Sequence, residues 1–247
     1  MLKILVGTIF SDVKDYVIRD WYKNVCQFTY PGFDICAIDN SKDKKYYKKI
    51  ANYFATHCKT SNIKSGTVLH TPRMHNQSEV FMAFSANELR KYFLANDYDI
   101  LIYNECDVFA VPDIIERLLS YNKPIISALF FTGNKRSSYP MIAQSDLFQD
   151  GSKMAIRGYL QAFYELGETE IPTECTSAGL GCTLIYKDII EKIPFKHDPE
   201  FNHHHDTIFA RDLWENNIAN FYAPIMCRHE NQTWNIQRKM IGNQRSK

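Results

Sequence analysis

The stretch Tyr98–Val108 reads YDILIYNECDV, and it decides the predicted fold. It begins as a short apolar strand, Ile100–Tyr103, and runs directly into two acidic residues, Glu105 and Asp107. Residues i and i+2 of an extended chain point the same way, so both carboxylates can converge at the strand's end, where open α/β sheets bind ligands. Carboxylate oxygens on a short, rigid stretch suit Mg²⁺ or Mn²⁺. A turn with two solvated acids is the alternative interpretation.

The first half of the chain alternates strand-like and helix-like segments around this stretch. Strands are expected at Leu2–Val6, Phe33–Ile38, Gly66–His70, Ile100–Tyr103 and Pro124–Leu129. Helices are expected at Asp12–Cys26, Lys44–Cys58, Ser78–Ala95 and Asp113–Ser120. Such alternation predicts a Rossmann-like α/β/α domain with a mostly parallel central sheet.

The second half of the chain is less regular. It predicts a polar loop at Gly133–Tyr139, helices at Lys153–Leu166 and Asp206–Asn216, a strand segment with two glycines at Thr173–Tyr186, and a final strand at Ala219–Tyr222 before Pro224. No internal repeat and no low-complexity linker interrupts the sequence, so residues 1–247 are expected to form one domain.

The composition is that of an ordinary globular protein. The 247 residues are 45% hydrophobic and 23% charged, enough to bury a sizeable core. A net charge of +1 gives no global indication of nucleic-acid binding. The basic tail Arg238–Lys247 could contact phosphate or an anionic membrane surface, and a solvated terminus is the simpler interpretation.

Cysteine usage and hydropathy indicate a cytoplasmic protein. The seven cysteines are an odd number without a C-x-x-C pair, so neither a disulfide framework nor a zinc site is expected. The apolar run Met1–Gly7 is too brief for a signal peptide. No apolar run approaches the roughly 20 residues that a membrane span requires, so no integral membrane segment is expected.

Four short motifs follow one another along the chain. They are Ile38-Asp39-Asn40-Ser41, Glu105-Cys106-Asp107, the segment Ser177–Asp188 and His205-Asp206-Thr207-Ile208-Phe209. In this order and spacing they resemble the motifs of the GT-A glycosyltransferases close to family 2, which use nucleotide sugars. The resemblance covers nearly the whole chain. It implies a GT-A fold with a nucleotide-sugar-binding half, 1–130, and an acceptor-binding half with the basic C-terminal tail, 131–247.

The resemblance also implies roles for individual residues. Asp39 would accept a hydrogen bond from the nucleobase, and Asp107, with Glu105, would hold the metal ion. Asp206 would be the catalytic base of an inverting enzyme, and His229, after the last strand, would complete the metal shell. Further donor contacts are expected from Thr8, Arg73, Asn87 and Glu105.

The expected chemistry calls for these residue types. A divalent cation would neutralise the charge on the departing diphosphate, and a carboxylate must accept the proton of the acceptor hydroxyl. A plain helix N-cap is the alternative for Asp206, and a surface or core histidine is the alternative for His229. Two residues depart from the family pattern: Glu105 stands where Asp is usual, and His205 where an acid is common.

We therefore expect a Mn²⁺- or Mg²⁺-dependent hexosyltransferase that takes a nucleoside diphosphate sugar, UDP-sugar rather than GDP-sugar, to a hydroxyl acceptor on a glycan, protein or modified base. A catalytically degenerate nucleotide- or glycan-binding module is the alternative. A nucleotidyltransferase fits less well, because Gly7–Asp12 lacks the glycine-rich, basic loop that holds a triphosphate. The sequence gives no indication of the oligomeric state.

Overall fold

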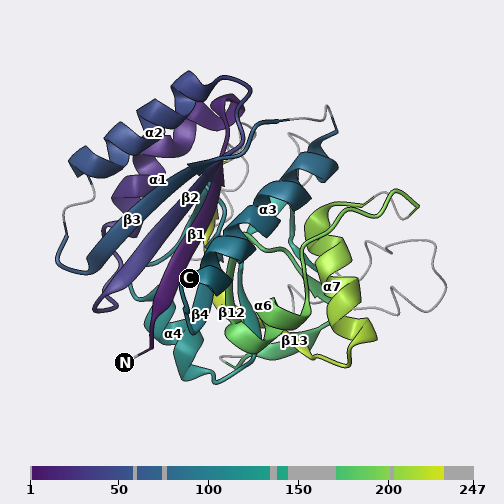
Figure 1. Ribbon diagram of the computed structural model, residues 1–247. Coiled ribbons are helices and arrows are strands. Elements are labelled where there is room, and N and C mark those ends of the chain that lie inside the picture. Colours follow the sequence, from purple (N-terminus) through teal and green to yellow (C-terminus); the bar gives the residue numbers. More distant parts are fainter. Residues whose placement is uncertain are drawn as a thin grey trace.

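The computed structural model describes residues 2–57, 60–73, 77–133, 138–143, 171–200 and 203–230. Its centre is a sheet of eight strands in the order β10-β13-β6-β12-β4-β1-β2-β3 (Figure 1). Strands from both halves of the sequence share this sheet, and β4, the strand of the opening stretch, lies between β12 and β1.

The strands of the large sheet are β1 (Ile4–Phe10), β2 (Phe33–Asp39), β3 (Ile63–His70), β4 (Ile100–Asn104), β6 (Ile125–Leu129), β10 (Thr173–Cys175), β12 (Cys182–Tyr186) and β13 (Asn220–Met226). The helices are the 3-10 segment η1 (Asp12–Val17), α1 (Ile18–Val25), α2 (Lys44–His57), α3 (Ser78–Ala95), α4 (Ile114–Ser120), α6 (Lys187–Lys192) and α7 (His205–Glu215). Short strands form three ribbons: β5 (Val108–Phe109) with β14 (Arg228–His229), β7 (Phe131–Gly133) with β8 (Ser138–Pro140), and β9 (Ile142–Ala143) with β11 (Ser177–Ala178).

The sheet is mostly parallel, as predicted. Among its eight strands, only β10 and β12 run against the rest. Strand β12 lies antiparallel between β4 and β6 and pairs Cys182 with Asn104. The start of β12 therefore lies beside the carboxyl end of β4, where the acidic residues follow.

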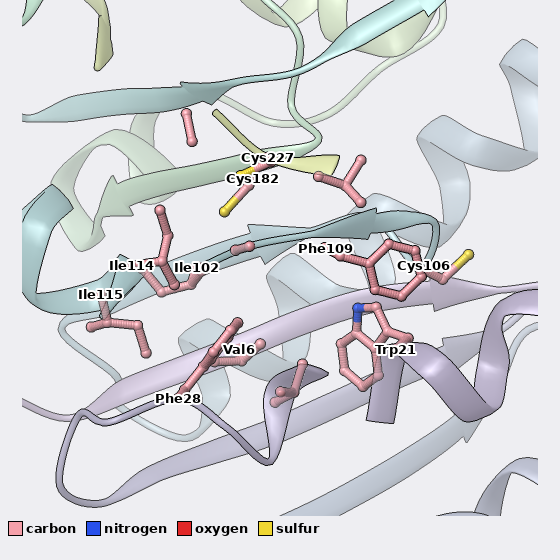
Figure 2. Close-up of a cluster of buried hydrophobic side chains, with 14 of the residues drawn as sticks. Val6, Trp21, Phe28, Ile102, Cys106, Phe109, Ile114, Ile115, Cys182 and Cys227 are labelled. Carbon is pink, nitrogen blue, oxygen red and sulfur yellow. The ribbon is translucent and has the colours of Figure 1, made fainter. Parts of the chain in front are cut away.

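Helices cover both faces of the sheet, and the alternation of side chains along the strands explains why. On β4, Ile100 and Ile102 pack in a core cluster with α1, α2 and α4, whereas Leu101 and Tyr103 pack in a second cluster with α3, α6 and α7. Figure 2 shows part of the first cluster, with Trp21 beneath the loop after β4. Each fully buried large side chain contributes about 1.5–3 kcal/mol. The two-faced core thus fixes the strand ends that carry the polar residues.

The helix predicted at Asp12–Cys26 is split in two. The 3-10 segment η1 precedes α1, and the backbone at Lys14 is non-helical, with φ −105° and ψ 27°. Ser11 caps this segment, because its side-chain oxygen accepts a hydrogen bond from Val13 N. The capped turn aims Lys14 differently from a residue in a continuous helix.

Two predictions for the second half are wrong in detail. The ends of the predicted loop Gly133–Tyr139 lie in the paired strands β7 and β8, and Phe131 and Thr132, which precede the loop, favour extended backbone. The last large strand does not end at Tyr222 but continues through Pro224 to Met226, and an irregular register there accommodates the proline. The helix predicted at Lys153–Leu166 and the tail Arg238–Lys247 lie outside the described residues.

None of the described helices combines the length and the apolar character that crossing a membrane requires. The described cysteines are free thiols, and all of them except Cys26 are buried.

Candidate active site

A buried asparagine shapes the loop that follows β4. Asn104, the last residue of β4, accepts a hydrogen bond from Trp21 Nε1 at 2.8 Å. Its amide nitrogen donates to the carbonyl oxygens of Val108 at 3.1 Å and Gly181 at 3.2 Å. The Glu105 amide donates to the same Gly181 oxygen at 2.8 Å. Every polar atom of the Asn104 side chain is thereby bonded, so this loop has a fixed shape.

The ribbon of β5 and β14 brings a distant histidine to this loop. His229 pairs with Val108, and Glu230 N donates to the Asp107 carbonyl oxygen at 2.7 Å. The two backbone contacts hold His229 beside Asp107, although many residues separate them in the sequence.

Glu105, Asp107 and His229 form a cluster in which one potential ligand atom from each lies within 4.8 Å of the others. Cys106, between the two acids, is buried in the first core cluster (Figure 2). The predicted convergence of the two carboxylates is therefore present, but it arises in a turn after β4, where Val108 N donates to Glu105 O at 3.0 Å, and not along an extended chain. Asp107 and His229 are buried, Glu105 is half-buried, and the buried Asp107 Oδ1 has no partner among the described residues.

The orientation of His229 is fixed by a backbone carbonyl. Its Nδ1 lies 2.8 Å from Phe131 O, and since a carbonyl can only accept, Nδ1 carries the proton. Nε2 then faces Asp107 Oδ2 at 3.3 Å. Neutral imidazole would turn a lone pair toward a carboxylate oxygen, so this arrangement requires either a proton on Nε2 or a cation between the two atoms. Metal-bound histidines commonly donate their other nitrogen to a carbonyl in this way.

The electrostatics of the cluster keep Asp107 ionised. Burial acts to raise the pKa of Asp107, but the hydrogen bond from His229 and the charge of Lys14 outweigh it and lower this pKa to about 2. Burial acts to lower the pKa of His229, and the bond to Asp107 raises it overall. The pKa of Glu105 is raised by burial and by the nearby Asp107, against the opposing charge of Lys14. Asp107 therefore carries a negative charge that its neighbours stabilise.

Lys14 is the residue that meets this charge directly. Its Nζ lies 2.7 Å from Asp107 Oδ2, the oxygen that also faces His229. The acidic neighbours raise the pKa of Lys14 although burial acts against this, so the ammonium group is charged.

The donor atoms of the cluster fit a divalent cation. Two carboxylates and one imidazole are ligands for Mn²⁺, and for Mg²⁺ less readily because of the nitrogen. The 3.3 Å between His229 Nε2 and Asp107 Oδ2 is close to the spacing of adjacent ligand atoms on a six-coordinate ion. The partnerless Asp107 Oδ1 offers another oxygen.

A cavity of about 530 Å³ adjoins the cluster, within the usual range of small-molecule sites. Its lining includes Lys14, Arg73, Phe81, Glu105 and Asp206. Arg73 is held in place, because its Nη2 donates to Ser11 Oγ at 2.8 Å and its guanidinium lies 4.2 Å from the centre of the Phe81 ring. We call Glu105, Asp107 and His229 the metal-type cluster. The cavity therefore brings one member of this cluster, Glu105, together with the cations Lys14 and Arg73 and the carboxylate of Asp206.

Asp206 reaches the cavity from the start of α7. The helix begins at His205 and its N-cap is His204. Asp206 is therefore the second helical residue: it is not the N-cap, and the prediction that it begins the helix is wrong by one position. Its Oδ1 accepts hydrogen bonds from the backbone and hydroxyl of Thr207, at 2.8 and 3.4 Å. The helix dipole favours negative charge in the first turn, where Asp206 lies.

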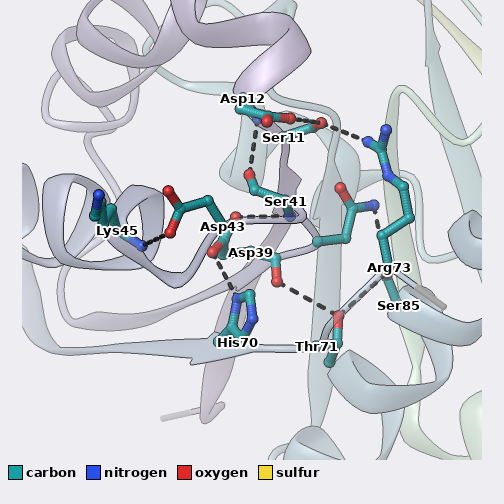
Figure 3. A network of polar contacts seen from close by, with 11 residues as sticks. Ser11, Asp12, Asp39, Ser41, Asp43, Lys45, His70, Thr71, Arg73 and Ser85 are labelled. Carbon is teal, nitrogen blue, oxygen red and sulfur yellow. Dashed lines mark hydrogen bonds and ion pairs between the residues drawn. The ribbon is translucent and has the colours of Figure 1, made fainter.

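Asp39 lies at the carboxyl end of β2 in a polar network (Figure 3). It is fully buried, and both its oxygens are engaged, one by Ser41 N at 3.0 Å and one by His70 Nδ1 at 2.8 Å. Ser41 Oγ in turn accepts from Asp12 N at 2.8 Å, which joins this network to the start of η1.

Thr8 and Asn87, the two other residues predicted to contact the donor, lie away from the cavity. Thr8 is fully buried within β1, and its hydroxyl has no partner among the described residues. Asn87 is bonded through both ends of its amide to the backbone of Phe195, so it holds the segment after α6 against α3. Neither residue lines the cavity beside the cluster.

Two residues of this region were not predicted from the sequence, Lys14 and His70. Lys14 was the first basic residue after the opening strand, but nothing in its spacing indicates a reach to Asp107. His70 ends β3 and pairs in register with Asp39, a relationship that follows from aligning the two parallel strands.

No protein-family model and no curated protein matches the sequence. Several solved structures resemble the fold. GalNAc-T7 with UDP, GalNAc and Mn²⁺ aligns with 95% of this chain and 45% of its own, at a TM-score of 0.60 and 11% identity. Residues 1–349 of S. aureus TarS align with 90% of this chain and 60% of their own, at a TM-score of 0.53 and 12% identity. A longer structure of S. aureus TarS aligns with 90% of this chain and 36% of its own, at a TM-score of 0.52 and 9% identity.

This chain thus spans less than two thirds of the length of each of these structures. At such identities the likeness concerns the fold and leaves activity aside. The eight-stranded sheet, with helices on both faces and its acidic loop after β4, corresponds to what the four sequence motifs predict. The chain has the GT-A fold of the nucleotide-sugar-dependent glycosyltransferases.

Proposed function

We propose that this protein is a metal-dependent glycosyltransferase that moves a hexose from a nucleoside diphosphate sugar to a hydroxyl acceptor. The observation that carries the proposal is the shared cavity: Glu105 of the metal-type cluster and the separate carboxylate of Asp206 line the same space. A metal-dependent, inverting transferase needs one group of ligands to hold a cation and another carboxylate, away from the cation, to take a proton.

Asp107, His229 and Glu105 would hold Mn²⁺ or Mg²⁺. The bound cation would neutralise the charge that develops on the diphosphate as it leaves. Phe131 O and the β5–β14 ribbon orient His229 before any ligand arrives. Such preorganisation lowers the reorganisation needed at the moment of reaction.

Asp206 is proposed as the base. A carboxylate in the first turn of α7 can accept the proton of an acceptor hydroxyl that lies in the cavity. Attack from the side of Asp206, opposite the departing diphosphate, would invert the anomeric centre.

The donor is proposed to lie along the ends of β1, β2 and β3. Arg73, fixed by Ser11 and Phe81, is placed to meet an anionic part of the donor, and the Asp39–His70 pair is assigned to the nucleobase end. Asp39 is fully buried, so it would act on the base through His70 rather than by direct contact. UDP-sugars are the first donors to test, ahead of GDP-sugars. Thr8 would contribute from beneath this site.

The first experiment measures thermal unfolding with UDP, GDP, CDP or ADP, each with and without Mn²⁺. A nucleotide at one hundred times its Kd stabilises the folded state by about 2.7 kcal/mol. We expect a shift with one nucleotide that requires Mn²⁺ and disappears in Asp107→Asn. The matched control is Asp97→Asn, which removes an exposed ion-paired carboxylate at the other end of β4.

Turnover is then measured as release of the nucleoside diphosphate from hexose donors. Release that is lost in Asp206→Asn, with nucleotide binding intact, supports the transferase. Binding without turnover for any donor would instead support the degenerate binding module. No nucleotide-dependent shift at all would refute the proposed donor site.

A further inference from the structure

The ammonium group of Lys14 lies against the carboxylate oxygen of Asp107 that the proposed metal ion would use. The ammonium lies 2.7 Å from Asp107 Oδ2, and His229 Nε2 faces the same oxygen at 3.3 Å. A cation bonded to both Asp107 Oδ2 and His229 would therefore lie next to the ammonium group. Two cations on one carboxylate oxygen repel each other strongly in a buried setting.

Of the two side chains on this oxygen, Lys14 is the one that can withdraw. The Lys14 side chain is 41% exposed, against 9% for His229 and 4% for Asp107. His229 is also tied to Phe131 O, whereas the ammonium of Lys14 approaches from the cavity that it lines. A rotation of the lysine side chain suffices, with no opening of the core.

The base of this side chain is held still. Lys14 N donates to Ser11 O at 2.9 Å, and Asp12 N donates to Ser41 Oγ at 2.8 Å, so the capped turn is anchored to the end of β2. The ammonium can move while its backbone stays at the rim of the cavity. Having left Asp107, it remains in a cavity that Arg73 also lines, where an anionic group would meet both cations.

We infer that Lys14 is a resident counter-ion of the metal site, which a divalent cation must displace from Asp107 and which then turns to the diphosphate of the donor. The inference rests on the proposed function, because it assigns a metal and a diphosphate to this cavity. It follows that the metal binds weakly to the free protein and more tightly once a diphosphate offers Lys14 another partner. By thermodynamic linkage, the metal strengthens diphosphate binding by the same factor.

The test measures the Kd of Mn²⁺ directly, from the electron paramagnetic resonance signal of the free ion, without any turnover. The variants are Lys14→Met, Lys14→Arg and Lys187→Met. Lys187 forms an ion pair with Asp97 at the opposite end of β4, so its substitution removes an equivalent ammonium away from the cavity. Circular dichroism and thermal unfolding establish that each variant is folded.

Lys14→Met is expected to bind Mn²⁺ at least about tenfold more tightly than the wild type in the absence of nucleotide. Lys14→Arg and Lys187→Met should stay near the wild-type value. Repeating the titration with UDP, and in parallel with GDP, should tighten Mn²⁺ binding more in the wild type than in Lys14→Met.

If Lys14→Met binds Mn²⁺ no more tightly than the wild type does, the inference is overturned. If the wild type in that case still binds Mn²⁺ together with a nucleotide, the proposed donor site stands. Absence of Mn²⁺ binding in every folded variant, with and without nucleotide, overturns the inference and the proposed function together.

Discussion

Tyr103 and His205 are hydrogen-bonded in the interior of the protein, with the Tyr103 hydroxyl 3.3 Å from His205 Nε2. Burial raises the pKa of Tyr103, so the hydroxyl keeps its proton and donates a hydrogen bond to His205. Burial lowers the pKa of His205 from its usual 6.5, against the opposing charge of Asp206. The contact joins β4 to the start of α7 and so fixes where Asp206 enters the cavity.

This contact predicts a pH dependence of stability. His205 is neutral in the folded protein and takes up a proton on unfolding below its ordinary pKa of 6.5. The contribution of neutral His205 is therefore complete above that pH and is lost as the pH falls. A difference of one bound proton changes the free energy of unfolding by about 1.4 kcal/mol per pH unit.

Urea unfolding between pH 8 and pH 5 measures this pH dependence of the free energy of unfolding. His205→Gln, which cannot titrate, should lose less stability on acidification than the wild type, and the other histidines cancel in the comparison. Parallel pH profiles for the two proteins would show that His205 is not the titrating group.

Asp206→Asn is expected to reduce turnover by about 10²–10⁴-fold, the usual contribution of a general base. Binding of nucleotide with Mn²⁺ should stay within about twofold, because the amide keeps the shape of the side chain and the first turn of α7. The matched control is Asp188→Asn, an acid in the first turn of α6. A variant that turns over normally would assign proton acceptance to another group.

Asn104→Ala is expected to destabilise the protein by about 2–4 kcal/mol, because it leaves the buried Trp21 Nε1 without an acceptor and removes one hydrogen-bond donor each from Val108 O and Gly181 O. The loop that carries Glu105 and Asp107 loses its anchor, so Mn²⁺ affinity should fall as well. Asn96→Ala, which removes an exposed amide at the end of α3, should cost less than about 1 kcal/mol. Chemical unfolding and Mn²⁺ titration report the two effects separately. Unchanged Mn²⁺ affinity in a folded Asn104→Ala would show that the loop holds its shape without this side chain.

Gly181→Ala tests the packing behind the metal-type cluster. A methyl group at position 181 would overlap the Phe130 ring, whose centre lies 5.4 Å from that of His229 in an edge-to-face contact. Displacing the ring should shift His229 and weaken Mn²⁺ binding by about tenfold. The double variant Gly181→Ala/Phe130→Leu makes room for the methyl group and should recover most of the affinity. Failure of the smaller side chain to restore binding would argue that the ring does not transmit the change.

Regular periodicity made much of this fold predictable. The apolar pattern of β4 indicated that Glu105 and Asp107 lie at the carboxyl end of this strand. The two acids are brought together by a turn, closed by a hydrogen bond from Val108 N to Glu105 O at 3.0 Å, and not by an extended chain. Helix Ser78–Ala95 has the predicted bounds, whereas the first strand, predicted at Leu2–Val6, spans Ile4–Phe10.

The rest depended on contacts that no local pattern encodes. Strands β5 and β14 have two residues each, too few for any periodic signal, yet they set His229 beside Asp107. Lys14 reaches Asp107 because the capped turn at Ser11 interrupts the predicted helix. Asn87 had the position expected of a donor contact, but it bonds to Phe195, which follows from how α6 and α3 pack rather than from the sequence around either residue.

His229 and Asp107 are separated by 122 positions in the sequence. A cation shared by them would act as a cross-link between an early and a late part of the chain, and closing so long a loop removes much freedom from the unfolded protein. During synthesis, the acidic pair emerges long before its third ligand. The complete centre can therefore form only after β14 has joined β5, so the ability to hold a metal ion reports that folding has reached its end.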